Sequence, residues 1–468
     1  MRYYFLGIGG TAMASLAGLL KMKGHKVWGT DKGIYPPMSD FLKSHQIRVN
    51  EGYSKDNLKE SFDLVVIGNS LSRGNEEVEE ILDKKLPFTS LPKLLHDEFV
   101  IKHHTIVITG THGKTSTTAI LSWIFEVAGL SPTFLIGGIA KNFSSSIKLG
   151  NGKHFIIEGD EYDSAFFDKR PKFLHYFPQH LIINNIEFDH ADIYHNLAEI
   201  KNEFKKLLRL IPSNGLIVAN GDDPNVRNIT QNKYSRLQLT GHDDNADWSY
   251  ANLKIRGIET KFDLLYKGKV IDHFVLSQPG EHQVQNSLSA IAVSRDLGID
   301  LKIIKKALES YQGVKRRLEY WGELNGAIVF DDFAHHPTAV KNTLDTIKKV
   351  YPQKRIIALF EPRTNTTVQN IFQEELFQAL SIADMVLITP IHRPERIPSP
   401  QRLSVSKLVQ NIKEIGKIAI YIDSHSEIKG ILLKTLCQDD VLVILTNGNL
   451  GGQYEEIKKI IQLDNVLG

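Results

Sequence analysis

A glycine-rich loop followed by Lys-Thr is the stretch of this sequence with the clearest chemical meaning. Residues 105–109 are mostly β-branched and residues 118–128 have a helical pattern, so the loop joins a strand to a helix. It departs from G-x-x-x-x-G-K-[ST], because Ile108 stands where the first glycine is expected. Backbone N–H groups would still bind a triphosphate, Lys114 would neutralise it, and the Thr115 hydroxyl would coordinate Mg²⁺. The predicted ATP site comprises Gly110, Thr111, His112, Gly113, Lys114, Thr115 and Ser116.

Two further predicted strands end in segments that contain acidic residues or histidine. The first runs into residues 158–163 and the second into residues 184–190. Because an open α/β sheet binds its ligand at the carboxyl ends of its strands, we expect both segments to face the glycine loop. Their oxygen atoms suit Mg²⁺, and one imidazole is tolerated in such a site. An acidic run is equally typical of a solvated loop, but the position beside a nucleotide loop favours the metal.

A second glycine pattern, residues 7–12, follows the first predicted strand and opens a helix. Gly7 and Gly9 permit a tight turn and close approach to a diphosphate, and Asp31 at the end of the next strand could accept a ribose hydroxyl. Taken alone, the pattern also fits an NAD(P)-dependent dehydrogenase, which is a second hypothesis. A third interpretation is that the glycines only let the helix pack on the sheet.

Residues 330–338 leave another strand and enter a helix, with Pro337 suited to the first helical turn. Two interpretations stay open, helix capping and a second wall of the ATP site. The adjacent histidines 335 and 336 point in different directions on any regular backbone, which disfavours a two-histidine metal clamp. Arg316 and Arg317 just upstream could bring charge to a transferring phosphoryl group, although paired arginines are also common on surfaces.

The elements that would position these residues follow an α/β rhythm. Short apolar runs ending in Gly, Asn or Asp alternate with helical segments, which predicts parallel sheets covered by helices. Residues 253–276 differ, because apolar and polar residues alternate around Lys267-Gly268 as in an antiparallel ribbon at a sheet edge. Domain boundaries are expected near residues 96–104 and 313–314. The predicted strands are residues 3–7, 26–30, 64–68, 105–109, 154–157, 181–184, 216–219, 327–330, 355–360, 385–389, 418–422 and 441–445.

The composition is that of a globular protein. The 468 residues suffice for about three domains, and 56 basic against 54 acidic side chains give a net charge of +2, with no general attraction to nucleic acid. No apolar run approaches the roughly 18 residues of a membrane span. The single cysteine, Cys437, excludes an intramolecular disulfide or a framework of Cys ligands. A reducing compartment, the cytoplasm, is therefore predicted.

Together these motifs resemble the Mur ligases, the ATP-dependent enzymes that join amino acids or peptides to UDP-N-acetylmuramic acid in bacterial cell-wall metabolism. The resemblance covers essentially the whole chain. It implies three α/β domains: a Rossmann-like UDP-sugar domain at residues 1–100, a P-loop ATP domain at 101–313, and a Rossmann-like domain at 314–468 that binds the incoming peptide and closes on ATP. The segments that carry it are residues 110–116, 185–190, 280–286 and 313–318.

The resemblance also assigns roles to single residues. Those implied for catalysis are Lys114, Glu158, His190 and Arg317. The implied magnesium ligands are Thr115, Glu158 and His190. Further ATP contacts are implied for His282, Asn286, Arg317 and Asp332. The UDP-sugar is assigned to Gly7, Gly9, Gly10, Thr11, Asp31, Asn69 and Ser70. The peptide is assigned to His335, His336, Glu361, Arg363 and Asn365.

Two branches of the family carry the GTHGKTS loop, one adding L-alanine and one reattaching the recycled tripeptide L-alanyl-γ-D-glutamyl-meso-diaminopimelate. The local sequence here resembles that of the recycling branch, and the alanine-adding branch is the alternative. Residues 391–397 match neither branch. The expected substrates are therefore ATP with Mg²⁺, UDP-N-acetylmuramic acid and the tripeptide, joined through an acyl phosphate. A regulator that has kept the fold without turnover is a further alternative, disfavoured because the catalytic set is complete. The segments that carry the branch resemblance are residues 35–38, 68–75, 158–170, 331–337 and 360–365.

Overall fold

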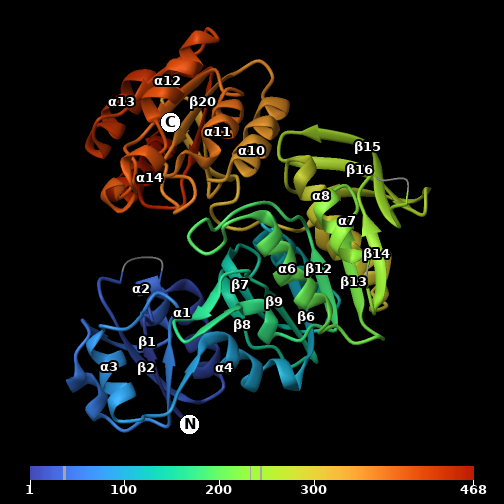
Figure 1. Cartoon of the computed structure of the whole chain (residues 1–468). Helices are drawn as coiled ribbons and strands as arrows, with labels where there is room; N and C mark the ends of the chain where they lie inside the picture. The colour runs from blue at the N-terminus through green and yellow to red at the C-terminus, as the bar shows by residue number, and fades with distance from the viewer. Residues whose placement is uncertain (35–37, 232, 243–244, 468) are drawn as a thin grey trace.

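The chain forms three α/β bodies that follow one another along the sequence (Figure 1). The structure is a computed structural model and describes residues 1–34, 38–231, 233–242 and 245–467. Each body is built around its own sheet, so the predicted fold class is confirmed. Within these ranges no helix is both long and apolar enough to cross a membrane.

The N-terminal body has a five-stranded parallel sheet of order β3-β2-β1-β4-β5. Its three inner strands are mostly buried, as expected for a parallel sheet with helices on its faces, whereas the edge strands β3 and β5 are more exposed. The elements are β1 (Arg2–Leu6), α1 (Thr11–Met22), β2 (Lys26–Asp31), α2 (Met38–Ser44), β3 (Arg48–Glu51), β4 (Leu64–Ile67), α3 (Glu76–Asp83), β5 (Phe88–Ser90) and α4 (Leu91–Glu98).

The central body has a ten-stranded sheet of order β17-β16-β15-β14-β13-β12-β6-β9-β7-β8. Its middle is parallel, and β15, β16 and β17 form the antiparallel ribbon predicted for one edge. The elements are β6 (His104–Thr109), α5 (Lys114–Val127), β7 (Thr133–Ala140), β8 (Ser145–Lys148), β9 (His154–Glu158), β10 (Asp163–Ala165), β11 (Asp168–Pro171), β12 (His180–Ile183), α6 (Leu197–Leu208), β13 (Leu216–Asn220), α7 (Pro224–Thr230), β14 (Arg236–Thr240), β15 (Trp248–Arg256), β16 (Glu259–Tyr266), β17 (Lys269–Leu276), α8 (Glu281–Asp296) and α9 (Leu301–Glu309).

The C-terminal body has a six-stranded sheet of order β18-β19-β23-β20-β21-β22, parallel except for β18. Pro337 opens α10, as predicted from its fixed φ and missing N–H. The elements are β18 (Glu319–Leu324), β19 (Ala327–Asp332), α10 (Pro337–Val350), β20 (Arg355–Phe360), α11 (Gln373–Leu380), β21 (Met385–Ile388), α12 (Val405–Glu414), β22 (Ile418–Tyr421), α13 (Ile428–Thr435), β23 (Asp440–Leu445) and α14 (Tyr454–Leu467).

The three bodies are joined in two different ways. One apolar core runs from the N-terminal body into the central one, where α1 packs on β7 and β8. The C-terminal body has its own cores on the two faces of its sheet. It is tied to the central body by the segment after α9, where Val314 pairs with Ala140 in an isolated β-bridge.

Candidate functional site

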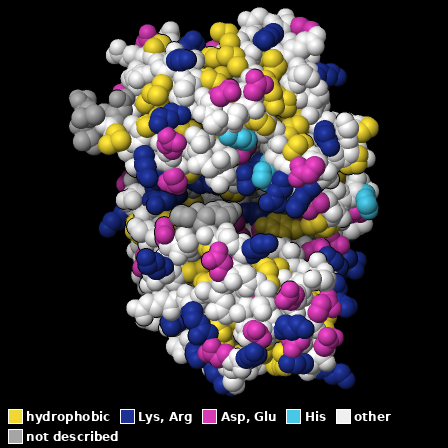
Figure 2. Space-filling view, turned by 90° about the vertical axis from the view of Figure 1, so that its left-hand side faces the viewer, with side chains coloured by type: hydrophobic (Ala, Val, Ile, Leu, Met, Phe, Trp, Pro, Cys, Tyr) yellow, Lys and Arg dark blue, Asp and Glu magenta, His cyan; other side chains and the backbone are white. Residues whose placement is uncertain are grey.

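A cavity of about 560 Å³ lies where the three bodies meet. Figure 2 shows a hollow running across this side of the molecule between its upper and lower parts, with Lys and Arg side chains along its rim. The cavity brings together residues that were predicted to bind ATP and magnesium, the UDP-sugar and the peptide. Those lining it are Gly10, Thr11, Asn69, Thr111, His112, Gly113, Lys114, Thr115, Ser116, Glu158, His190, His282, Asn286, Arg317, Asp332 and His335.

The glycine loop has the backbone that a phosphate site requires. Gly113 lies at φ +79° and caps α5 without a side-chain hydrogen bond, so the first N–H groups of the helix stay available. A Cβ atom on Gly113 would lie 2.5 Å from Asn286 Oδ1, and one on Gly110, at φ +125°, would lie 3.0 Å from Asn185 N. Only glycine fits at these two positions, and the dipole of α5 favours an anion in front of Lys114.

Lys114 is held by a carboxylate that the sequence did not single out. Its Nζ donates to Gly110 O at 2.7 Å and to Glu161 Oε2 at 3.0 Å, and His190 Nε2 lies 3.2 Å from Glu161 Oε1. Burial opposes charge on Glu161, but Lys114 and His190 outweigh it and lower the pKa of Glu161 to about 2. Burial likewise opposes charge on His190, and Glu161 outweighs it and raises the pKa of His190. The three side chains form a charged triad in which Lys114 and His190 line the cavity wall and the buried Glu161 lies behind them.

Thr115 and Glu158 form the opposite part of this wall. Thr115 Oγ1 donates to Glu158 Oε2 at 3.1 Å, and the backbone N–H of Gly137 donates to Glu158 Oε1. Arg317 crosses from the C-terminal body to Thr115, with Nη2 at 3.4 Å from Oγ1. Burial and the neighbouring charge of Asp160 raise the pKa of Glu158 to about 7. A cation placed here would restore the charged carboxylate.

The donor set fits a magnesium ion in part. The Thr115 hydroxyl and the Glu158 carboxylate are adjacent hard oxygen donors, which is the chemistry that Mg²⁺ prefers. His190 is turned toward Glu161 instead of toward Glu158. Its role as a metal ligand stays a prediction, and would require release from Glu161.

The adenine-side predictions lie at the start of α8. His282 and Asn286 both line the cavity, one turn apart on the helix. Gly280 at φ +111° makes room for the imidazole, since a Cβ there would lie 2.7 Å from His282 Cε1. Burial lowers the pKa of His282 to about 4, so a neutral ring with one donor and one acceptor faces the cavity.

The two arginines upstream of β18 separate in the structure. Arg317 lines the cavity, whereas Arg316 turns into the C-terminal body and donates to Thr446 O at 2.6 Å. Asp332 lines the cavity wall, yet its carboxylate accepts from Leu318 N and Ala334 N, both at 2.7 Å. It therefore braces the backbone that carries Arg317.

Of the predicted N-terminal glycines, Gly10 lines the cavity at the start of α1, whereas Gly7, Gly9 and Asp31 do not. Asp31 Oδ2 accepts from Gly9 N at 2.6 Å, and a Cβ on Gly9 would lie 2.8 Å from the same oxygen. Asp31 therefore holds the glycine loop in place, and its predicted ribose contact stays a prediction. Gly7, at φ +78°, lies beside Ser70, which is exposed and, like Gly7, Gly9 and Asp31, is not among the cavity-lining residues.

Three family models match the chain in succession. The Mur ligase family catalytic domain matches residues 2–99, the Mur ligase middle domain matches residues 108–294, and the Mur ligase glutamate ligase domain matches residues 316–448. The chain belongs to the Mur ligase family. This membership accounts for the N-terminal glycine pattern and removes the reason for the dehydrogenase hypothesis.

Relatives of two kinds are similar to this Mur ligase over nearly its whole length. The UDP-N-acetylmuramate–L-alanyl-γ-D-glutamyl-meso-2,6-diaminoheptandioate ligase of Escherichia coli is 39% identical, covering 98% of this chain and 97% of its own. The UDP-N-acetylmuramate–L-alanine ligase of Dictyoglomus turgidum is 34% identical, covering 96% and 94%. The crystal structure of a murein peptide ligase from Psychrobacter arcticus superposes with a TM-score of 0.74 at 34% identity, covering 98% of each chain.

The peptide residues predicted for this Mur ligase do not form one group. His335 lines the cavity, while His336 turns toward Glu187. Glu361 is buried, accepts from the Thr446 hydroxyl and lies 3.5 Å from Arg363 Nη1. Neither Glu361 nor Arg363 lines the cavity.

Asn365 and the segment 391–397 lie near the other residues of the predicted peptide site. Asn365, which is also outside the cavity lining, donates to Asp192 Oδ2 of the central body at 2.9 Å. The unmatched segment 391–397 lies beside the Glu-Pro-Arg turn, because His392 N donates to Pro362 O at 3.1 Å. Residues 35–37, part of the branch resemblance, lie outside the described residues.

A second cavity, about 740 Å³ in volume and open to solvent, was not anticipated from the sequence. It lies along α6, on the other side of β10 from the first cavity, since Tyr162 and Ser164 face the first and Asp163 faces the second. Its lining carries both signs of charge. The charged residues are Asp163, Lys169, Asp192, Glu199, Glu203, Lys205, Lys206 and Arg209.

Proposed function

We propose that this Mur ligase joins the tripeptide L-alanyl-γ-D-glutamyl-meso-diaminopimelate to UDP-N-acetylmuramic acid, converting ATP to ADP and phosphate. The observation that carries the proposal is the cavity, in which a phosphate loop faces side chains of both other bodies. Three substrates must meet in such an enzyme, and three bodies contribute walls. The choice of the tripeptide over L-alanine is supported by the greater identity to the Escherichia coli relative.

We assign one substrate to each body. Residues 1–100 would bind the UDP-sugar, residues 101–313 would bind ATP, and residues 314–468 would bind the peptide and close over the other two. The N-terminal contribution to the cavity supports this assignment, because Gly10, Thr11 and Asn69 lie across from the P-loop. The free thiol of Cys437, exposed on the surface, fits the cytoplasm as the place of action.

The chemistry requires activation of a carboxylate, which is a poor acyl donor. Attack of the sugar's lactyl carboxylate on the γ-phosphate of ATP gives an acyl phosphate and ADP, and the tripeptide amine then displaces phosphate. Lys114 and Arg317 approach the phosphate site from two bodies and would offset the repulsion between the two anions. Magnesium held by Thr115 and Glu158 would supply further charge stabilisation.

Glu161 adds a step that the sequence did not suggest. In this structure its carboxylate lies between Lys114 and His190 and compensates the charge of Lys114 in a largely enclosed site. When the triphosphate arrives, Lys114 would transfer from Glu161 to the phosphate oxygens. The buried charge on Lys114 is thus compensated both before and after ATP binds, and we propose Glu161 as a positioning residue.

The proposal is tested by following phosphate release from ATP with Mg²⁺ and UDP-N-acetylmuramic acid. Parallel reactions contain the tripeptide, free L-alanine or no acceptor. Release only with the tripeptide supports the proposal, and release with L-alanine would assign the chain to the alanine-adding branch. ATP binding without release in any mixture would support the regulator that has lost turnover.

A further inference from the structure

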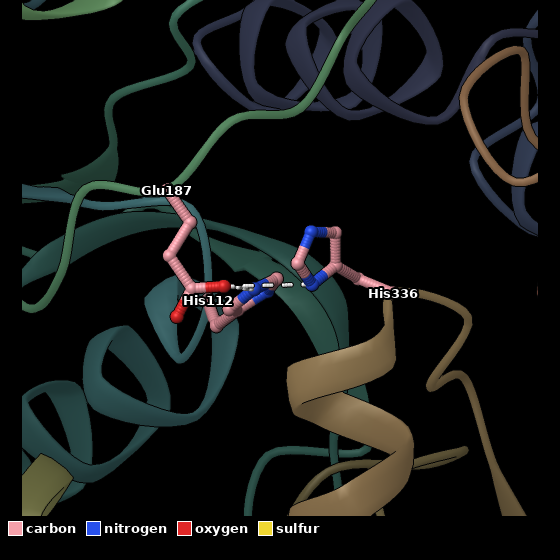
Figure 3. A group of neighbouring side chains, drawn as sticks. All are labelled: His112, Glu187 and His336. Atoms are coloured by element: carbon pink, nitrogen blue, oxygen red, sulfur yellow. Dashed lines mark hydrogen bonds and ion pairs between the residues drawn. The ribbon is translucent and has the colours of Figure 1, made fainter. Parts of the chain in front are cut away.

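A compact cluster of two histidines and a glutamate lies between the central and C-terminal bodies. His112 belongs to the glycine loop, Glu187 follows β12, and His336 caps α10. Figure 3 shows the three side chains pointing toward one another, with His336 at the start of its helix and the other two coming from the central body. One donor atom from each lies within 4.8 Å of the others.

The distances between the donor atoms are close to those around a bound ion. His112 Nε2 lies 3.3 Å from Glu187 Oε2, and His336 Nδ1 lies 3.6 Å from the same oxygen. Ligands at about 2.0–2.2 Å from a tetrahedral Zn²⁺ are roughly 3.4 Å apart. A small rotation of the two rings would therefore let all three atoms bind one ion.

The surroundings of His336 set which of its ring nitrogens carries the proton. His336 Nε2 lies 3.2 Å from the carbonyl oxygen of Phe188, which can only accept, so Nε2 carries the proton and donates. Nδ1 therefore keeps its lone pair, which accepts from Thr338 N at 3.3 Å as the cap of α10, and an ion would take the place of this hydrogen bond. A histidine that binds a metal is typically oriented in this way by a hydrogen bond from its other ring nitrogen.

The carboxylate is oriented as well. The Thr338 hydroxyl donates to Glu187 Oε2 at 2.6 Å, which fixes the carboxylate with this oxygen close to both histidines. Glu187 is about one third exposed and His336 only 5%, so the cluster is reached from the carboxylate side. This gives an ion a path into a site whose innermost ligand is buried.

We propose that His112, Glu187 and His336 bind a borderline divalent cation of the Zn²⁺ class, which ties the central body to the C-terminal one. Two imidazole nitrogens and one carboxylate oxygen suit such ions, whereas Mg²⁺ prefers oxygen alone. The site is separate from the predicted magnesium ligands Thr115 and Glu158. Because its ligands come from both bodies, a bound ion holds them in the closed arrangement.

The experiment uses the full-length protein, freed of metal with a chelator and kept without nucleotide. Excess Mg²⁺ is added first to occupy oxygen-rich sites, and Co²⁺ is then titrated while its visible absorption is followed. Co²⁺ reports tetrahedral nitrogen and oxygen coordination, and Zn²⁺ should displace it. The expected result is one equivalent of tetrahedral Co²⁺. No such band, or binding that Mg²⁺ abolishes, would overturn the proposal.

Substitutions test whether the bound ion lies at this cluster. His112→Ala and His336→Ala, on opposite bodies, should each lose the bound equivalent, and two positions keep the test valid if one variant folds poorly. Thr338→Val should weaken Co²⁺ binding by about 10- to 100-fold through the misoriented carboxylate. Glu158→Gln is the matched control and should retain the equivalent. Loss in Glu158→Gln with retention in both histidine variants would refute the site, without bearing on the ligase assignment.

Discussion

The two junctions between the three bodies are chemically opposite. At the first, side chains of α1 and α4 join those of β7, β8 and β9 in one buried apolar core. Gly18 lets the backbone of α1 come close to the central body, since a Cβ there would lie 2.8 Å from Ile147 Cδ1. At the second, Phe188 of the central body packs against the C-terminal core and Val314 of the linking segment packs into the central core, while several other contacts are polar.

Named contacts show how the polar junction is built. Thr366 Oγ1 donates to Asp189 Oδ1 at 2.9 Å and accepts from Ala191 N at 3.3 Å, Arg317 reaches Thr115, and Glu187 joins the two histidines of the cluster described above. Each of these hydrogen bonds can be exchanged for one to water at a net cost of about 0.5–1.5 kcal/mol.

The difference indicates which body moves. Separating the first junction exposes apolar surface at about 25 cal/mol per Å², so the N-terminal body should stay docked. The second junction follows a backbone with two non-glycine residues at positive φ, Arg316 at +60° and Leu318 at +48°. We infer that the C-terminal body opens and closes about this segment, which would admit substrates and then shield an acyl phosphate from water.

The largest effect is expected at Lys114, which lines the cavity between the three bodies. Lys114→Ala removes the charge that faces the transferring phosphoryl group, and phosphate release in the complete reaction should fall by at least about 10²–10³-fold. The same replacement leaves Glu161 buried with His190 as its remaining charged partner. Stability is therefore expected to fall as well, and must be separated from catalysis.

A double variant makes this separation. Lys114→Met with Glu161→Gln removes both charges of the pair, so its melting temperature should recover relative to Lys114→Ala, while phosphate release should stay low. Recovery of release in the double variant would contradict the role of Lys114 at the phosphate. Calorimetry and the phosphate assay on the three proteins give the comparison.

Much of the fold could be predicted from local pattern, but the packing at the first junction could not. Every predicted strand is present to within about two residues, and the ribbon turns at Lys267-Gly268 as expected, because apolar runs and glycine turns are local signals. The strands missed are β3, β5, β7, β8, β10, β11, β14 and β18. Gly137 and Gly138 interrupt the apolar run of β7. The position of this strand depends on contacts with α1 and, at Gly137, with Glu158.

The polar junction was much less visible in the sequence. The glycine loop and the acidic run were found by their residue types, yet Glu161 and Glu187 acquired their importance only from partners far along the chain. His336 was predicted at the peptide, and this role stays a prediction; in the structure its ring lies beside Glu187, because its position as the cap of α10 orients it. Likewise, the Asp31 carboxylate accepts a hydrogen bond from Gly9 N, a contact that the spacing of the two residues did not indicate. Hydrogen-bond direction depends on docking, which residue spacing does not encode.

The apolar junction is broken most directly at Gly18. Gly18→Leu would push α1 away from Ile147 and Phe41, and overpacking of this kind typically costs about 1–3 kcal/mol. The melting temperature of the transition that includes the N-terminal body should fall by several degrees, measured by calorimetry. Gly430→Leu is the matched control, since Gly430 is also helical but has nothing within 4 Å of an added Cβ. Leucine has a higher helix propensity than glycine, so Gly430→Leu should keep or raise the melting temperature, and equal losses in both variants would show that the junction is not responsible.

The polar junction should respond in activity more than in stability. Thr366→Val keeps the shape of the side chain and removes the hydroxyl shared by Asp189 and Ala191 N. A loss of about 1 kcal/mol of closed-state stabilisation corresponds to roughly a fivefold fall in kcat/KM. Thr230→Val, whose hydroxyl bonds only within α7, should leave kcat/KM unchanged. A melting temperature lowered as much as by Gly18→Leu would contradict the division between the junctions.

The smallest effect concerns pH and lies just behind the polar junction. Asp331 accepts from Tyr454 Oη at 2.5 Å and lies 3.4 Å from Arg316 Nε, and its burial raises the pKa of its carboxyl to about 7. The folded chain therefore holds a proton there that the unfolded chain, at about 3.9, has released, and this contribution to stability is lost as pH rises from about 4 through 7. Asp331→Asn cannot titrate, so its melting temperature should fall less than that of the wild type across this range. Glu158 titrates in both proteins and cancels in the difference. If the melting temperatures of the wild type and Asp331→Asn change in parallel between pH 4 and 8, Asp331 is ionised throughout this range. The segment at Arg316 would then be held by a permanent ion pair.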